Sequence, residues 1–139
     1  MTHPLDRAVW NALTTRLSGF VTADTDARAV RIDPEVGIFV SGADAEPETL
    51  KAMAALARAH PGAGLVEKTG GPLAEVDLPG VEVINRIPLL QMVCEAQTPG
   101  GPDLAFETLT ETDAPEMLAL ATLTRPGPFR SRTRRLGPF

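Results

Sequence analysis

The feature that most constrains the fold of this chain is a helix signal near its C-terminal end that is apolar on nearly every side. Thr112 or Asp113 suits the N-cap of this helix, and Pro115 suits its first turn. The helix then reads MLALATL over residues 117–123 and ends at Thr124, because the following RPGP cannot continue it. A helix without a polar face is normally covered on most of its surface. The fold must therefore provide that cover.

Periodicity predicts two further helices in the first half of the chain. Residues 5–17 place apolar side chains at helical spacing and stop at a Ser-Gly pair. Residues 46–60 form the clearest amphipathic helix, with Pro47 in the first turn and a Pro-Gly pair after the last. Both helices have one apolar stripe, so we expect each to pack on a sheet.

Seven short apolar segments are predicted to be strands. They are residues 20–21, 29–32, 37–40, 64–67, 81–84, 87–93 and 104–109. The run IPLLQMV at 87–93 is typical of a strand that is buried on both faces. This order of elements indicates an α+β fold with helices packed on a mixed β-sheet, although it does not indicate the strand order. We expect these residues in the core: Trp10, Leu13, Ile38, Leu50, Met53, Leu65, Val83, Leu89, Leu90, Met92 and Leu118.

Composition narrows the class of protein. A length of 139 residues with 43% hydrophobic residues is that of an ordinary globular domain. No apolar run approaches the roughly 20 residues that span a bilayer, and the N-terminus lacks the basic and apolar regions of a signal peptide. The single cysteine, Cys94, lies in an apolar run, so we expect a buried, reduced thiol. These features predict a cytoplasmic protein without a membrane partner.

The charges are distributed unevenly along the chain. The net charge is -5, but five of the 13 basic residues follow the last acid, Glu116. This leaves 8 bases against 18 acids before residue 125, so the body carries -10 and the tail +5. The tail has no lysine and few aromatic residues, and the acidic body repels phosphate, which disfavours nucleic acid as a partner. The tail is either a solvated face or a face that pairs with other protein.

Signals for catalysis and metal binding are weak. The two histidines, His3 and His60, lack the short spacing to other ligands that a zinc site requires, so no metal is expected. The serines lack a Gly-x-Ser-x-Gly context, and no phosphate-binding loop is present. No pair of carboxylates stands out as buried. The sequence therefore identifies no catalytic residue.

Four strings of residues occur together in this chain. They are LDR at 5–7 followed by WNALTT at 10–15, PLLQMV at 88–93, DAPEMLAL at 113–120, and TRPGPF at 124–129. These strings resemble the N-terminal part of GNAT-family (GCN5-related) N-acetyltransferases that carry an extra N-terminal region. The resemblance implies two domains: an N-terminal α/β region over residues 1–98, and the start of an incomplete acetyltransferase core over 99–139. Residues 104–109 and 115–124 would be the first strand and first helix of that core.

The resemblance also implies acetyl-CoA as the cofactor of the intact protein, but this chain lacks the family's cofactor signature. That signature, Arg/Gln-x-x-Gly-x-Gly/Ala, lies between a strand and a helix and holds the pyrophosphate on backbone N–H groups. The nearest string, RRLGPF at 134–139, has Pro138 and Phe139 at unsuitable positions, and we interpret it as a chance match. The chain also has no tyrosine to act as the family's late acid. We therefore expect no cofactor-binding residue and no activity from this chain alone.

The family reaction is attack of an amine on the acetyl-CoA thioester, so this chain could contribute only to binding of a small-molecule amine acceptor. Three residues are candidates for this substrate side. Arg125 and Phe129 lie in the loop after the last helix, where the alternative is a packed turn. Gln91 is the polar residue of an apolar strand, where the alternative is a core amide bonded to the backbone.

Two functions remain open. In the first, the chain is the N-terminal segment of an acetyltransferase, and its partner is the remaining core of that enzyme. In the second, it is a non-catalytic binding or assembly domain. The uncovered helix predicts self-association of the isolated chain.

Overall fold

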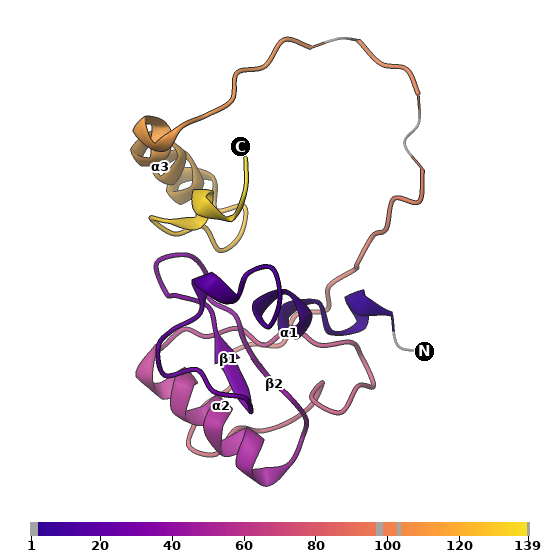
Figure 1. The fold of residues 1–139 in the computed structure, drawn as a ribbon, viewed down its shortest axis with the longest axis vertical. Coiled ribbons are helices and arrows are strands. Elements are labelled where there is room, and N and C mark those ends of the chain that lie inside the picture. Colours follow the sequence, from indigo (N-terminus) through magenta and orange to yellow (C-terminus); the bar gives the residue numbers. More distant parts are fainter. Residues whose placement is uncertain (1–2, 97–98, 103, 139) are drawn as a thin grey trace.

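The computed structural model describes residues 3–96, 99–102 and 104–138. Its N-terminal unit, residues 3–80, contains helices α1 (Ala8–Leu13) and α2 (Pro47–Ala59) and strands β1 (Ala29–Arg31) and β2 (Val40–Gly42). A linking segment, whose described residues are 81–96, 99–102 and 104–109, leads to helix α3 (Ala114–Thr124) (Figure 1). The chain then returns to the N-terminal unit. The predicted α+β fold class is confirmed.

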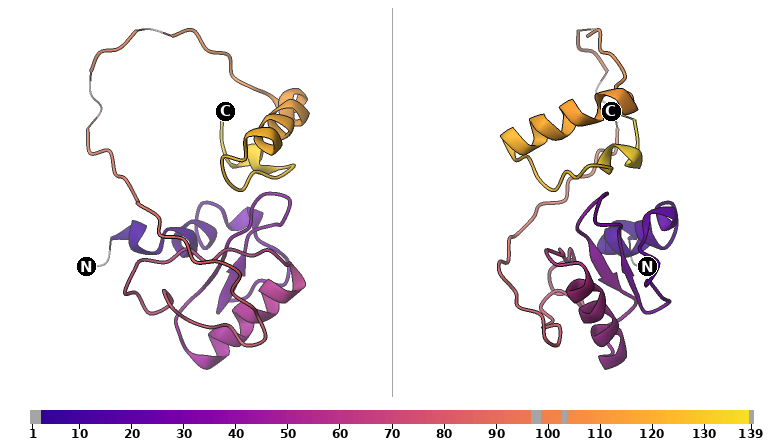
Figure 2. Two further views of the ribbon diagram at one scale, coloured as in Figure 1. Left: turned by 180° about the vertical axis from the view of Figure 1, so that it is seen from behind. Right: turned by 90° about the vertical axis from the view of Figure 1, so that its left-hand side faces the viewer.

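Strands β1 and β2 form an antiparallel hairpin in which Ala29 lies opposite Gly42. Successive residues of a strand point to opposite faces, so this hairpin carries a hydrophobic cluster on each side. Ala29 packs with Met53 of α2 on one face, and Val30 packs with Leu13 of α1 on the other. The hairpin therefore lies between the two helices (Figure 2, right).

Helix α2 confirms the prediction for residues 46–60. Pro47 occupies the first turn, and the buried residues Thr49, Met53 and Leu56 lie three or four positions apart on one face. The helix approaches β2 closely, because a Cβ atom built on Gly42 would lie 2.5 Å from Sδ of Met53. Glycine is therefore the residue that this crossing accommodates.

The first helix is shorter than the sequence predicts. A 3-10 turn (Pro4–Arg7) precedes α1, which ends at Leu13, whereas the prediction extended over residues 5–17. The two residues that follow, Thr14 and Thr15, are β-branched and bond through their hydroxyls to the carbonyls of Trp10 and Asn11. Such side chains lower helix propensity, so the helix ends before its apolar pattern does.

The predicted strands at 64–67, 81–84, 87–93 and 104–109 are wrong for this structure. Residues 64–67 contribute only a parallel bridge between Phe39 and Gly64, and residues 81–96 and 104–109 contain neither helix nor strand. The side chains of residues 82–96 and 104–109 are exposed, with Leu90 and Phe106 each 88% accessible. A strand needs a neighbour to accept its backbone hydrogen bonds, and no described residue forms a β-ladder or β-bridge with the described part of the linking segment.

The predicted core is correct only within the N-terminal unit. Leu13 and Met53 are buried. Five of the expected core residues are half-buried: Trp10, Ile38, Leu50, Leu65 and Leu118. Four others lie in the linking segment and are exposed: Val83, Leu89, Leu90 and Met92. Cys94, expected to be buried, is exposed for the same reason.

Helix α3 forms where the sequence predicts it. A 3-10 turn (Glu111–Asp113) leads into it, and Arg125 ends it in the left-handed conformation, with φ of 50°. None of its residues, all of which the structure describes, is buried. The predicted domain boundary at residue 98 lies outside the described residues. Within the described ranges, no helix is long and apolar enough to cross a membrane.

Candidate functional site

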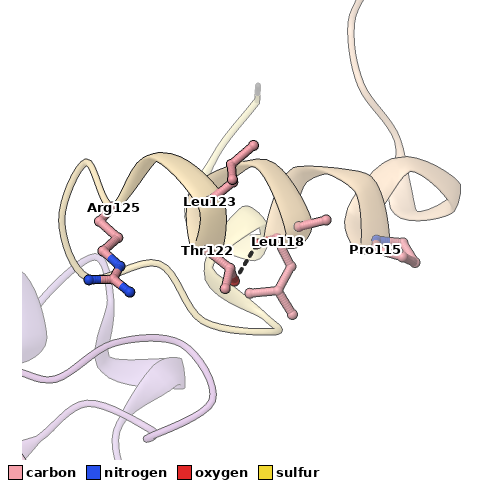
Figure 3. A pocket seen from close by; sticks show the side chains of 6 residues that line it. Pro115, Leu118, Thr122, Leu123 and Arg125 are labelled. Atoms are coloured by element: carbon pink, nitrogen blue, oxygen red, sulfur yellow. Dashed lines mark hydrogen bonds between the residues drawn. The ribbon is translucent and has the colours of Figure 1, made fainter.

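A concave surface lies along α3. It is an open groove of about 730 Å³, lined by Pro115, Leu118, Ala119, Thr122, Leu123 and Arg125. The floor is apolar because these residues follow the spacing of one helix face. Thr122 adds little polarity, since its hydroxyl donates to the carbonyl of Leu118 at 2.7 Å (Figure 3). The groove therefore suits an apolar or amphipathic group.

Arg125 supplies the positive charge at one end of the groove. Its backbone N–H donates to the carbonyl of Ala121 at 2.9 Å and closes the helix. Its left-handed backbone turns the chain sharply, and its side chain extends toward the N-terminal unit (Figure 3). The guanidinium is exposed to solvent.

The other end of the groove is held by a capping box. Oδ2 of Asp113 accepts hydrogen bonds from the backbone N–H of Thr110 at 2.7 Å and from its hydroxyl at 3.0 Å. The backbone bond, followed by the hydroxyl bond, lowers the pKa of Asp113 below its ordinary value. The carboxylate therefore stays ionised and serves as a cap, not as an acid in catalysis.

The structure does not bring the three predicted substrate-side residues into one site. Arg125 lines the groove. Phe129 is half-buried in the turn that follows and makes contacts of its own. Gln91 is exposed in the linking segment, so its alternative interpretation as a buried core amide is wrong. The substrate roles themselves remain predictions.

A second hollow, which the sequence did not indicate, lies beside α2 and is acidic. Its volume is about 340 Å³, and it is lined by Asp24, Asp26, Ala52, Ala55, Leu56 and Ala59. The Thr22 hydroxyl lowers the pKa of Asp24, and the backbone N–H groups of Arg28 and Ala29 lower that of Asp26. Both carboxylates therefore stay ionised near neutral pH and cannot donate a proton there.

The described residues do not fit the pyrophosphate of acetyl-CoA. Such a site needs backbone N–H groups at a helix N-terminus and no negative charge beside them. The connection from β2 to α2 has the required strand–loop–helix order, but Asp44, Glu46 and Glu48 surround the helix start. Pro47 also removes one N–H group. Residues 134–138 offer no alternative, since they follow no strand and begin no helix longer than a 3-10 turn.

Metal ligation is equally unsupported in the part of the chain that the structure describes. No group of three His, Cys, Asp or Glu side chains there is placed to hold an ion. His60 Nε2 lies 3.5 Å from Oδ2 of Asp24, but no third ligand joins this pair among the described side chains.

Comparison with known proteins relates the chain to a solved structure. No family model matches the chain, and no curated protein does. Its structure is similar to the crystal structure of a protein from Novosphingobium aromaticivorans assigned to the GNAT family of acetyltransferases. The two share 39% sequence identity with a TM-score of 0.78. The match covers 99% of this chain and 58% of the other, so this chain spans less than two-thirds of that protein.

Fold and sequence together relate the chain to the acyltransferases. Within that class, the resemblance to the GNAT family predicted from the sequence is confirmed, because nearly the whole chain aligns with a GNAT-family protein at 39% identity.

Proposed function

We propose that this chain is the N-terminal, acceptor-side segment of a GNAT-family N-acetyltransferase, and that it does not transfer acetyl groups alone. The coverage of 58% of the similar protein supports this proposal, because the remaining 42% has no counterpart here. The acidic start of α2 and the absence of a glycine-rich loop leading into a helix in the described ranges support it also. Acetyl-CoA would then be held by residues outside this chain. We place the protein in the cytoplasm, as its sequence predicts.

The observation that carries the proposal is the exposure of apolar segments whose sequence is typical of strands. Ile84, Leu90, Met92 and Phe106 are each 86% to 92% accessible. Exposure of so many large apolar side chains on one segment is costly in water. Pairing of the linking segment with further strands would bury these side chains and would also cover α3.

The chemistry that the chain can contribute is binding and orientation of the acceptor. Acetyl transfer to an amine requires an aligned nucleophile, a route for its proton and donors for the developing oxyanion. The apolar floor of the groove on α3 can contact the hydrocarbon part of an acceptor, and Arg125 can contact an anionic or hydrogen-bond-accepting group on it away from the amine. Every described carboxylate whose pKa departs from its ordinary value is shifted downward, namely Asp6, Asp24, Asp26, Asp44, Glu48 and Asp113. None of these has the raised pKa expected of a general base for an ammonium group.

The proposal is tested by comparing two proteins: this chain and the product of its complete reading frame. Release of the coenzyme A thiol is measured with acetyl-CoA and a panel of small amines. We expect turnover from the longer product and none from the 139-residue chain. A reading frame that stops after Phe139, or acetyl transfer by the chain alone, would contradict the proposal.

The second candidate function is a non-catalytic assembly domain. The same exposed apolar side chains favour it, because a second copy of this chain could cover them. A concentration-dependent dimer that persists in the product of the complete reading frame would support this alternative. A monomeric, active longer product would exclude it.

A further inference from the structure

The arginine-rich tail is not a solvated face. Residues 130–136, here called the strap, lie against the loop formed by residues 33–36 of the N-terminal unit, between β1 and β2 (Figure 1). The strap includes the 3-10 turn Thr133–Leu136. It joins parts of the chain that are far apart in sequence, so its contacts fix the return of the chain after α3.

Backbone and side-chain hydrogen bonds attach the strap to the N-terminal unit. The backbone N–H of Arg132 donates to the carbonyl of Glu35 at 2.7 Å. The hydroxyl of Thr133, which is buried, donates to the carbonyl of Val36 at 2.6 Å and accepts the N–H of Arg130 at 2.7 Å. The bond from Thr133 to Val36 is buried and the bond from Arg130 to Thr133 is partly buried, so together they favour one position of the strap.

Charge complementarity reinforces this seating. Nη1 of Arg132 lies 2.9 Å from Oδ2 of Asp33 and 3.3 Å from Oε2 of Glu35. Leu136 also packs against the hydrophobic cluster that contains Val36. An exposed ion pair alone contributes little to stability. Here the ion pairs of Arg132 lie beside the buried hydroxyl of Thr133 and the packed side chain of Leu136, which hold the same segment in place.

The other side of the strap is attached to the start of α3. Nη1 of Arg134 lies 2.7 Å from Oε2 of Glu111, and Nη2 of Arg135 lies 3.6 Å from its Oε1. Glu111 begins the 3-10 turn that leads directly into α3. One short segment therefore pairs with the N-terminal unit through Arg132 and with α3 through Arg134 and Arg135.

We propose that the strap is a clasp that holds α3, its groove and the loop of residues 124–129 at a fixed position on the N-terminal unit. Arg132 and Thr133 are its positioning residues. They do not line the groove, so they act through the placement of the segment that does. Only the identity of what the groove binds rests on the proposed function; the clasp itself does not.

The clasp is tested by a distance measurement that requires no activity. Spin labels are placed on exposed sites of α2 and α3, with the substitutions Ala55→Cys and Leu123→Cys, in a chain whose own exposed thiol is removed by Cys94→Ser. Electron–electron double resonance then gives the distribution of distances between the labels. We expect one narrow distribution in this labelled parent.

The strap is then released by combining Arg132→Ala with Thr133→Val in the labelled parent. We expect the distribution to broaden at least twofold while far-ultraviolet circular dichroism is unchanged. Arg16→Ala is the matched control, because Arg16 is exposed and lies outside the strap. Thr133→Ser keeps the hydroxyl and should retain the narrow distribution even if the double variant loses its fold.

Three results would overturn the clasp. They are a broad distribution in the labelled parent, an unchanged distribution in the folded double variant, and a broadening by Thr133→Ser or Arg16→Ala as large as that of the double variant. Inactivity of the longer reading-frame product would contradict the proposed function but would leave these distances, and hence the clasp, unaffected.

Discussion

Replacing Gly42 by alanine tests the packing on which the N-terminal unit depends. A Cβ atom at this position would lie 2.5 Å from Sδ of Met53 and 2.6 Å from Cγ2 of Thr49. Both residues are buried on α2, with exposures of 0% and 2%. The strand cannot retreat freely, because Gly42 pairs with Ala29 and its carbonyl accepts a hydrogen bond from Arg7. Helix and hairpin must therefore move apart.

The expected loss of stability follows from two opposing effects. Overpacking of a close-packed core costs about 1 to 3 kcal/mol, whereas replacing glycine restricts the unfolded chain and returns roughly 0.4 to 1 kcal/mol. Subtracting the middle of the second range from the middle of the first gives a destabilisation of about 1.3 kcal/mol for Gly42→Ala. In a small domain, each kcal/mol lowers Tm by about 4 to 8 °C.

Thermal unfolding followed by Trp10 fluorescence measures this loss, because Trp10 packs against one face of the hairpin. Gly19→Ala is the matched control: a Cβ there meets no described atom within 4 Å, so its Tm should not fall. Combining Gly42→Ala with Thr49→Ser removes one of the two close contacts and should restore part of the lost Tm. An unchanged Tm for Gly42→Ala, or an equal fall for Gly19→Ala, would refute the reasoning.

Three further predictions concern the surface and the site. Leu90→Lys with Phe106→Lys should weaken self-association of the isolated chain, because both side chains are 88% exposed; unchanged sedimentation velocity profiles at rising concentration would count against this. The pKa of Asp26 in the folded chain lies below its ordinary value of 3.8. Its contribution to the free energy of unfolding is therefore complete above pH 3.8 and is lost as the pH falls through the folded pKa. Asp26→Asn should therefore flatten the acid side of the urea-unfolding profile, and an unaltered profile would show that this carboxylate does not contribute. In the complete reading-frame product, Phe129→Ala should raise KM for the amine and leave KM for acetyl-CoA unchanged; an unchanged amine KM would remove Phe129 from the site.

Local signals predicted the helices well. Proline in the first turn and a closing proline or glycine placed α2 and α3 within one or two residues of their observed bounds. The residues at which these helices begin and end are determined by residues next to them in the sequence, so these bounds can be predicted from a single sequence. The first helix was predicted too long because its apolar spacing continues to Leu17, past the threonines that end it.

Non-local contacts were not predictable in the same way. Residues 87–93 have the composition of a buried strand, but a strand forms only where a neighbour accepts its hydrogen bonds, and sequence periodicity does not identify that neighbour. The same limit applies to the site. Arg125 was predicted from its loop and does line the groove, whereas the partners of the tail arginines, Asp33 and Glu35, lie too far away in sequence to be inferred.

The long separation between the two halves of the clasp also bears on the order of folding. The bonds from Arg132 to Asp33 and from Thr133 to Val36 span 99 and 97 positions. The entropy lost in closing a loop grows with its length, while the hairpin and α2 form from nearby residues. Ribosomes add about 5 to 20 residues per second, so we expect the N-terminal unit to bury its two clusters before Thr133 is synthesised. The loop of residues 33–36 would then be a preformed template on which the last segment of the chain docks.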